Sequence, residues 1–135
     1  MTTTLSTQTN LSLPTETSLA TLWLILVRLV TQYGVDGEDF IREIGINPAV
    51  IRDPAARIPR RFGEIAFARA LACVPDPAFG LQAAKCRHPS NLGVAGYAWL
   101  SSKNLRTGLK RLERFSQVFG PRVNFRCKEE NDGLR

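Results

Sequence analysis

The sequence has little of what catalytic and metal-binding sites are made from. It holds one histidine, His88, and three widely spaced cysteines, Cys73, Cys86 and Cys127, with no Cys-x-x-Cys pair. An odd number of cysteines does not make a disulfide framework, and Cys86 with His88 supplies only two of the four ligands that zinc normally takes. The G-x-S-x-G, H-E-x-x-H and P-loop motifs are also missing. We therefore expect reduced thiols, no catalytic residues, no metal and no cofactor, in a protein that is not an enzyme.

No hydrophobic run in the sequence is long enough to span a membrane. The most apolar stretch, Ser18 to Val30, falls short of the ~20 residues that a spanning helix needs, and it contains Arg28. The residues that precede it include no lysine or arginine, which a secretory signal would place near its start. The stretch therefore indicates a buried helix of a cytoplasmic protein that has no membrane partner.

What the sequence does have is positive charge and enough apolar residues for a core. The formal net charge is +6, the pI is about 9.8, and 44% of the residues are hydrophobic. This composition predicts one folded domain or part of a larger one, and it is compatible with nucleic acid, an anionic membrane or an acidic partner. Residues 1–14 are rich in Thr, Ser, Asn and Gln and are predicted to be a flexible tail, with the domain over 15–135.

Helical periodicity dominates the chain after this tail. The first helix is expected to be capped by Thr15 or Thr17 and to end at Gly34, and it is apolar almost all round. Further helices are predicted over residues 36–45, 47–53, 62–74, 76–87, 92–100 and 105–119. Glycine, proline or a capping residue separates most of them, which is typical of a multi-helix domain.

The stretch from His88 to Ser102 combines a turn with a short helix. Gly93 and Gly96 lie on the same face of that helix, which predicts that another backbone packs very close to it. Tyr97 and Trp99 are expected to supply buried area, with Trp23 of the first helix. These three aromatic residues are also candidates for the walls of a ligand pocket.

The helix predicted over residues 105–119 is amphipathic. Its apolar residues share one arc, and the opposite side carries the only concentrated basic face of the sequence, formed by Lys103, Arg106, Lys110 and Arg114. A solvated face is one interpretation, and contact with phosphate or with an acidic neighbouring domain is another. An alternative function follows from the second interpretation, that of a stand-alone helical module that binds nucleic acid through this face.

After residue 120 the apolar period changes from helix to strand. Val123, Phe125 and Cys127 alternate with polar residues, which predicts a half-buried strand, and Asn131 and Asp132 before Gly133 form a hairpin turn signal. A single strand cannot satisfy its own hydrogen bonds. We therefore expect a mainly α (α+β) fold that ends in the start of a hairpin and is incomplete at its C-terminus, unless a partner chain supplies the further strands.

Four blocks of the sequence occur in a characteristic order. Gly-x-x-Pro-x-x-Ile is followed by Asp-Pro-x-Ala-Arg-Ile-Pro (45–59), and Asp-Pro-x-Phe-Gly-Leu comes next (76–81). His-Pro-x-x-Leu-Gly-x-x-Gly-Tyr-Ala-x-x-Ser-Ser (88–102) precedes Leu-x-x-Gly-Leu-x-x-Leu (105–112). In these blocks the chain resembles the N-terminal effector or sensor domain of AraC-family transcription regulators, in the mainly helical subgroup called arabinose-binding-like.

The resemblance covers roughly residues 18–133 and implies a regulatory function. It implies that a small-molecule effector biases an attached helix-turn-helix domain, so that the chain would act on DNA only indirectly. Residues 15–135 would then be the N-terminal part of a bacterial sensor domain, without the C-terminal helix-turn-helix domain. A homodimer is a further partner that the resemblance implies.

Overall fold

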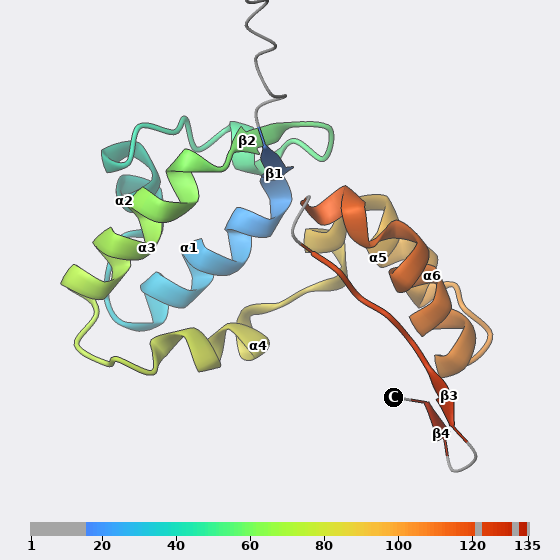
Figure 1. The fold of residues 1–135 in the computed structure, drawn as a ribbon. Coiled ribbons are helices and arrows are strands. Elements are labelled where there is room, and N and C mark those ends of the chain that lie inside the picture. The colour runs from blue at the N-terminus through green and yellow to red at the C-terminus, as the bar shows by residue number, and fades with distance from the viewer. Residues whose placement is uncertain (1–15, 121–122, 131–132, 135) are drawn as a thin grey trace, which may run out of the picture.

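The computed structural model describes residues 16–120, 123–130 and 133–134, and the described chain is mainly helical (Figure 1), as the predicted mainly α (α+β) class requires. The α-helices are α1 (Trp23–Gln32), α2 (Gly37–Glu43), α3 (Arg61–Cys73), α4 (Ala83–Cys86), α5 (Gly93–Leu100) and α6 (Leu105–Phe119). The 3-10 helices are η1 (Ala20–Leu22), η2 (Val50–Arg52), η3 (Phe79–Gln82) and η4 (Pro89–Leu92). Strands β1 (Thr17–Leu19) and β2 (Arg57–Pro59) form one antiparallel pair, and β3 (Glu129–Glu130) and β4 (Gly133–Leu134) form another.

The segment before the first α-helix is a strand, where the sequence predicts a helix. β1 pairs along its whole length with β2, and α1 begins only at Trp23. A helix capped at Thr17 is therefore wrong, because the main-chain groups of residues 17–19 bond across to β2 instead of along a helix. Thr15 and the predicted tail over residues 1–14 lie outside the described residues.

Most helix ends follow the residues that predict them. α1 and α2 are each followed by a glycine with positive φ, Gly34 at 81° and Gly45 at 90°, a conformation that glycine adopts without strain. Asp36 caps α2, and the side chain of Asn104 caps α6 by accepting from the N–H of Thr107 at 2.9 Å. The helices predicted over residues 47–53 and 76–87 are shorter than expected, since the first is η2 alone and the second is divided into η3 and α4.

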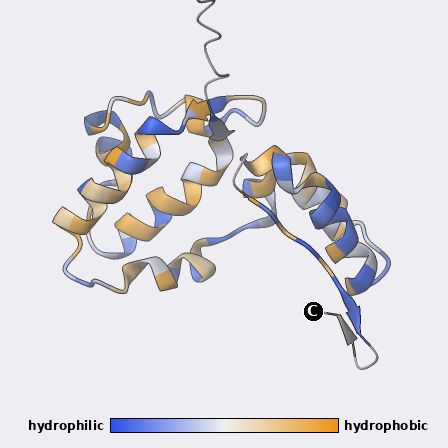
Figure 2. Ribbon diagram, in the orientation of Figure 1, coloured by the Kyte–Doolittle hydropathy of each residue, from blue (hydrophilic) through white to orange (hydrophobic). Residues whose placement is uncertain are grey.

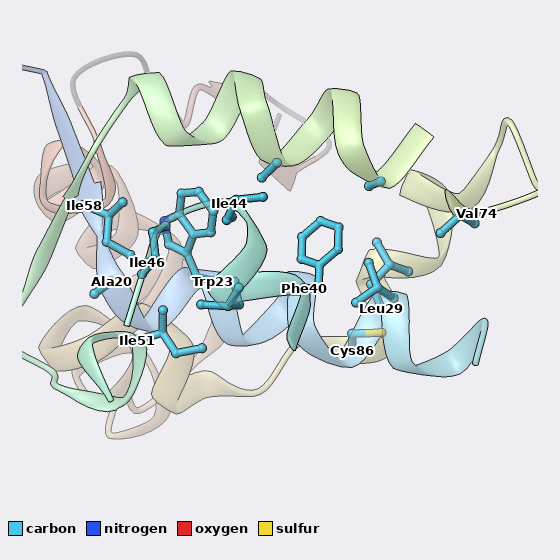
Figure 3. Close-up of a cluster of buried hydrophobic side chains, with 14 of the residues drawn as sticks. Ala20, Trp23, Leu29, Phe40, Ile44, Ile46, Ile51, Ile58, Val74 and Cys86 are labelled. Atoms are coloured by element: carbon cyan, nitrogen blue, oxygen red, sulfur yellow. The ribbon is translucent and has the colours of Figure 1, made fainter. Parts of the chain in front are cut away.

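The hydrophobic core lies between α1, α2 and α3. Figure 3 shows Trp23 and Phe40 in the layer between α1 and α3, and Phe40 and Ile41 of α2 are buried. α1 is hydrophobic along most of its length (Figure 2), because the core and its surroundings cover it on several sides. Within the described ranges no helix is both long enough and apolar enough to cross a lipid bilayer. The buried cluster consists of Ala20, Trp23, Leu29, Val30, Phe40, Ile41, Ile44, Ile46, Ile51, Ile58, Ala66, Ala70, Val74, Phe79 and Cys86.

The close approach of another backbone, predicted at the glycines of α5, is confirmed at Gly96, whereas the neighbour of Gly93 is a side chain. A Cβ atom added to Gly96 would lie 1.9 Å from the carbonyl oxygen of Pro89, so only glycine fits there. Gly93 has a φ of 55° and packs against Leu19 of β1. The backbone that approaches α5 most closely is therefore its own preceding turn, η4. α5 in turn packs against α6, where Gly108 faces the indole of Trp99.

Three arginines bind main-chain carbonyls near the C-terminal ends of helices. Arg28 donates to Cys86 in α4 at 3.0 Å. Arg57 donates to Val118 in α6 at 3.0 Å and also binds the side chain and the carbonyl of Thr17. Arg111 donates to Ala98 in α5 at 2.7 Å. Carbonyls in the last turn of a helix have no main-chain partner within the helix, and they lie at the negative end of the helix dipole. A guanidinium stabilises them by a hydrogen bond and also by its positive charge.

A buried asparagine joins the α5–α6 pair to the rest of the molecule. Asn91 in η4 has no exposed surface, and its side chain accepts from the N–H of His88 at 2.7 Å and donates to the carbonyl of Thr21 at 3.4 Å. The hydroxyl of Thr21 donates back to the carbonyl of Asn91 at 2.9 Å. These bonds fix η4 against η1, seventy residues apart in the chain. These hydrogen bonds satisfy the polar groups of the buried Asn91 side chain, and they give a partner to the His88 N–H and to the Thr21 carbonyl.

The C-terminal segment differs in part from its prediction. Residues 123–128 have no regular strand pairing within the described chain, and Val123 and Phe125 are 41% and 37% exposed, so a half-buried strand over 123–127 is wrong. The hairpin is confirmed by the pairing of β3 with β4, although the turn residues Asn131 and Asp132 lie outside the described residues.

Candidate functional site

Two adjoining hollows share the wall formed by Leu22, Trp23 and Gly63. The first, of about 240 Å³, lies between α1 and α3 and is completed by Leu26, Ala66 and Phe67. The second, of about 300 Å³, lies where β1, the beginning of α1, the beginning of α3 and the end of α6 meet. We call the second one the junction cavity. Its lining residues are Glu16, Thr17, Ser18, Leu22, Trp23, Arg60, Gly63, Phe119, Gly120 and Val123.

The space in both hollows follows from two residues. Gly63 lies in the first turn of α3, and a Cβ atom added there would meet no atom within 4 Å outside its own helix. Trp23 forms part of the wall of both hollows. It is buried, and its indole N–H donates to the hydroxyl of Ser18 at 3.3 Å. The indole orientation is therefore fixed, while the place of one side chain in α3 is left empty.

An ion pair lies at the edge of the junction cavity. The guanidinium of Arg60 binds the carboxylate of Glu16 at 2.9 Å and that of Glu64 at 3.2 Å. The main chain holds the first two residues together as well, since the N–H of Arg60 donates to the carbonyl of Glu16 at 2.8 Å. Glu16 and Arg60 both line the cavity, whereas Glu64 does not. Among the described lining residues, the cavity thus combines apolar walls with one positive and one negative side chain.

The described residues of the lining are mostly apolar, with a few polar side chains at the edge. Among the described residues of the lining there is no cysteine or histidine, and Glu16 is the only carboxylate. In the part of the chain that the structure describes, no three His, Cys, Asp or Glu side chains are grouped as a metal site would require. The three cysteines are not bonded to one another. An apolar cavity with a few polar groups at its edge is typical of a small-molecule site.

The structure separates the three aromatic residues that the sequence singles out. Trp23 lines both hollows. Tyr97 is 62% exposed on α5, so the expectation that it is buried is wrong, and neither it nor Trp99 lines the hollows. Trp99 is half-buried between α6 and the guanidinium of Arg87, which lies 5.1 Å from the centre of its ring. Their place in a ligand site stays a prediction.

Arg60 and Gly63 were not among the residues predicted from the sequence. The signal that could have found Gly63 is its position as an isolated glycine inside a helical pattern, where a glycine costs stability and so suggests a packing or functional reason. Arg60 carries no such signal, because arginines are common in this chain and only the fold brings this one beside Glu16.

The basic face of α6 is partly paired within the chain. Glu129 of β3 binds the ammonium of Lys110 at 2.7 Å and the guanidinium of Arg106 at 3.3 Å. Arg114 lies over the ring of Phe115 at 5.7 Å from its centre, and Lys103 is exposed at the loop before α6. The hairpin therefore neutralises part of the charge that a nucleic acid would contact. The hydrogen bond from Lys110, its charge and the charge of Arg106 lower the pKa of Glu129 below its ordinary value of 4.5.

We predict that replacing Lys110 with methionine raises the pKa of Glu129 back toward 4.5, because Lys110 supplies the largest stabilisation of its charged form. A group whose folded pKa is lowered contributes stability above its unfolded pKa and loses it as the pH falls through the folded pKa. The small contribution of this exposed pair should thus disappear only below pH 4.5. NMR titration of the Glu129 carboxyl measures the shift, and Lys103→Met is the control that should leave it unchanged. If the pKa of Glu129 were the same in Lys110→Met as in the wild type, the pairing of Lys110 with Glu129 would be contradicted.

Comparison with known proteins agrees with the blocks found in the sequence. Residues 34–135 match the family model described as the arabinose-binding domain of AraC transcription regulator, N-terminal. The match includes α3 and α6, and it begins after β1 and the whole of α1. The chain is also 29% identical over 96 residues to the ornithine utilization regulator of Pseudomonas aeruginosa, an alignment that covers 70% of this chain and 28% of the relative. The family is one of transcription regulator domains and not of enzymes, and this chain belongs to it.

Proposed function

We propose that this domain senses a small-molecule effector in the junction cavity and thereby controls the DNA-binding domain of an AraC-type regulator. The single observation that supports the site is an apolar cavity of about 300 Å³ whose walls come from β1, α1, α3 and the end of α6. The family supports the regulatory function, because its members are the N-terminal domains of transcription regulators.

The position of the cavity offers a physical basis for signalling. Phe119, Gly120 and Val123 come from the end of α6 and the segment after it, whereas Leu22 and Trp23 belong to the helices around the main core. A ligand held between these elements binds some of their relative positions better than others. It would shift the population toward the positions that it prefers, by its difference in binding free energy between them.

Further parts of the proposal concern the whole regulator. The chain spans 28% of the length of its curated relative, and we propose that the DNA contacts are made by a helix-turn-helix domain, so that this domain acts on DNA indirectly. A homodimer and a cytoplasmic location belong to the same proposal. The pairing of Glu129 with Lys110 and Arg106 supports indirect action, because it reduces the charge that α6 presents.

The proposal is tested by binding to the chain itself. Small metabolites, with L-ornithine among them because of the relative's name, are screened for compounds that raise Tm. A compound present at ten times its Kd should stabilise the wild type by about 1.4 kcal/mol. Gly63→Leu, which places a side chain at the empty position of α3, should weaken its binding at least about tenfold, since the added side chain competes for the same space. Gly63→Ala is the matched control, because its Cβ meets no neighbour and adds little volume.

A fluorescence titration locates the bound compound. In a Trp99→Phe variant the remaining tryptophan is Trp23, and its emission should change on binding. In a Trp23→Phe variant the remaining tryptophan is Trp99, which lies outside the lining, and its emission should not respond. Binding that Gly63→Leu does not affect, or that only Trp99 reports, would refute the site.

A further inference from the structure

We propose that the junction cavity recognises an α-amino acid with an apolar side chain, through its ammonium and its carboxylate together. This inference rests on the proposed function and names the chemical class of the effector. It is carried by the juxtaposition of one acidic and one basic side chain, Glu16 and Arg60, with apolar walls in a single cavity.

The ion pair at the edge is the electrostatic complement of a zwitterion. The closest atoms of Glu16 and Arg60 are 2.9 Å apart, and each side chain is about two-fifths exposed, at 43% and 41%. A guanidinium has five N–H donors, and within the described chain Arg60 uses one on Glu16 and one on Glu64. It can therefore accept a ligand carboxylate while it keeps a carboxylate neighbour. The ammonium of the same ligand then gives Glu16 a further cationic partner.

A ligand with one charge fits this edge less well. A monocarboxylate would bring a second anion next to Glu16 and compete with Glu16 for Arg60. A monoamine would bring a second cation next to Arg60 and compete with Arg60 for Glu16. Each would weaken the existing pair without replacing what it loses. The zwitterion satisfies both charges, so the edge discriminates by the requirement for two opposite groups on one ligand.

The interior determines the side chain of the ligand. Beyond the edge the larger lining side chains are those of Leu22, Trp23, Phe119 and Val123, and the described lining residues include no second carboxylate. A side-chain ammonium would be buried there without a partner, which costs far more than burying an apolar group gains. The volume of about 300 Å³ suits a side chain as large as that of leucine or phenylalanine.

The experiment is isothermal titration calorimetry of the full chain with four probes that share one ring. L-Phenylalanine carries both charges, 3-phenylpropionate only the carboxylate, phenethylamine only the ammonium, and N-acetyl-L-phenylalanine amide neither. We expect L-phenylalanine to bind at least about tenfold more tightly than each of the others, since each other probe loses a charge-assisted hydrogen bond. Equal or tighter binding of any single-charge or neutral probe would overturn the proposal, as would the absence of L-phenylalanine binding.

Two substitutions assign the charges to their partners. Glu16→Gln should remove the preference for L-phenylalanine over 3-phenylpropionate, and Arg60→Gln should remove its preference over phenethylamine. Glu64→Gln is the matched control, because Glu64 binds Arg60 but does not line the cavity, and it should keep both preferences. These ratios are measured within each variant, so a general loss of stability does not imitate them. Unchanged ratios in Glu16→Gln and Arg60→Gln would contradict the assignment.

The failure of this inference differs from a failure of the proposed function. If the cavity instead binds a sugar, a neutral compound or a simple carboxylate, and Gly63→Leu prevents that binding, the effector site stands and the amino-acid class is refuted. If no compound from the wider screen binds in a way that Gly63→Leu affects, both fail.

Discussion

Replacing Gly96 with alanine is expected to destabilise the protein by about 3 kcal/mol, at the upper end of what overpacking costs. The new Cβ atom would lie 1.9 Å from the carbonyl oxygen of Pro89 and 2.8 Å from its carbonyl carbon. Both are main-chain atoms of η4, which cannot turn away as a flexible side chain could. The helix α5 must therefore move from η4, and the packing of η4 against η1 is disturbed with it. Urea denaturation followed by circular dichroism measures the change in the free energy of unfolding.

The same substitution in α3 gives a matched control. A Cβ atom added to Gly63 meets nothing within 4 Å outside its own helix, and its backbone does not have positive φ. Gly63→Ala should therefore be neutral or stabilising by up to about 1 kcal/mol, because alanine loses less backbone entropy in a helix. If Gly96→Ala and Gly63→Ala gave similar free energies of unfolding, the close approach of η4 to α5 would be refuted.

The substitution Asn91→Ala is expected to lower the free energy of unfolding by about 2–3 kcal/mol. The Asn91 side chain is the partner of the His88 N–H and of the Thr21 carbonyl, and it is completely buried. Its removal leaves the buried Thr21 carbonyl and the partly buried His88 N–H without these bonds, and a void between η4 and η1. Because Asn91 is completely buried, the loss of these bonds carries a desolvation cost.

A surface substitution one residue away controls for local effects. Ser90 makes its side-chain hydrogen bond to the exposed ring of His88 at 2.8 Å, so Ser90→Ala should change stability by no more than about 0.5 kcal/mol. Hydrogen exchange adds a second readout, since Asn91→Ala should speed the exchange of the His88 amide more than Ser90→Ala does. Equal stability of Asn91→Ala and the wild type would show that the Thr21–Asn91 contact is not formed in solution.

The helices were predictable from the sequence because their signals are local. Each signal lies within a few residues of the helix that it marks. The signals are apolar residues at helical spacing, a capping residue such as Asp36 or Asn104, and a terminating glycine such as Gly34 or Gly45. The close approach of a backbone at Gly96 was also predictable, since a glycine in a helix costs stability, which suggests a close neighbour.

The strand β1 was not predictable in this way. It has three residues, which are too few to show the alternation of a strand, and its partner β2 lies about forty residues further along the chain. The exposure of Tyr97 is a similar case. The apolar residues of α5 lie on all sides of the helix, so its sequence does not show which side is buried. Only the placement of η4 and α6 decides which of these residues are covered.

The junction cavity was predictable only in part. Trp23 was singled out as an aromatic residue, but the cavity is a space between β1, α3 and α6, which the sequence does not bring together. The pairing of Glu16 with Arg60 depends on a main-chain contact between segments more than forty residues apart. A sequence shows which side chains exist, whereas a void and an ion pair depend on where the fold leaves them.

The arginine contacts at the helix ends have a consequence for how this domain can diverge. Arg28, Arg57 and Arg111 each bind a main-chain carbonyl, so the acceptor is present whichever amino acid stands there. Mutations at Val118 or Ala98 can accumulate over evolutionary time without loss of these hydrogen bonds, while changes of the three arginines cannot. Homologous domains should accordingly drift at the accepting positions and retain the donors, an asymmetry that a set of aligned relatives would reveal.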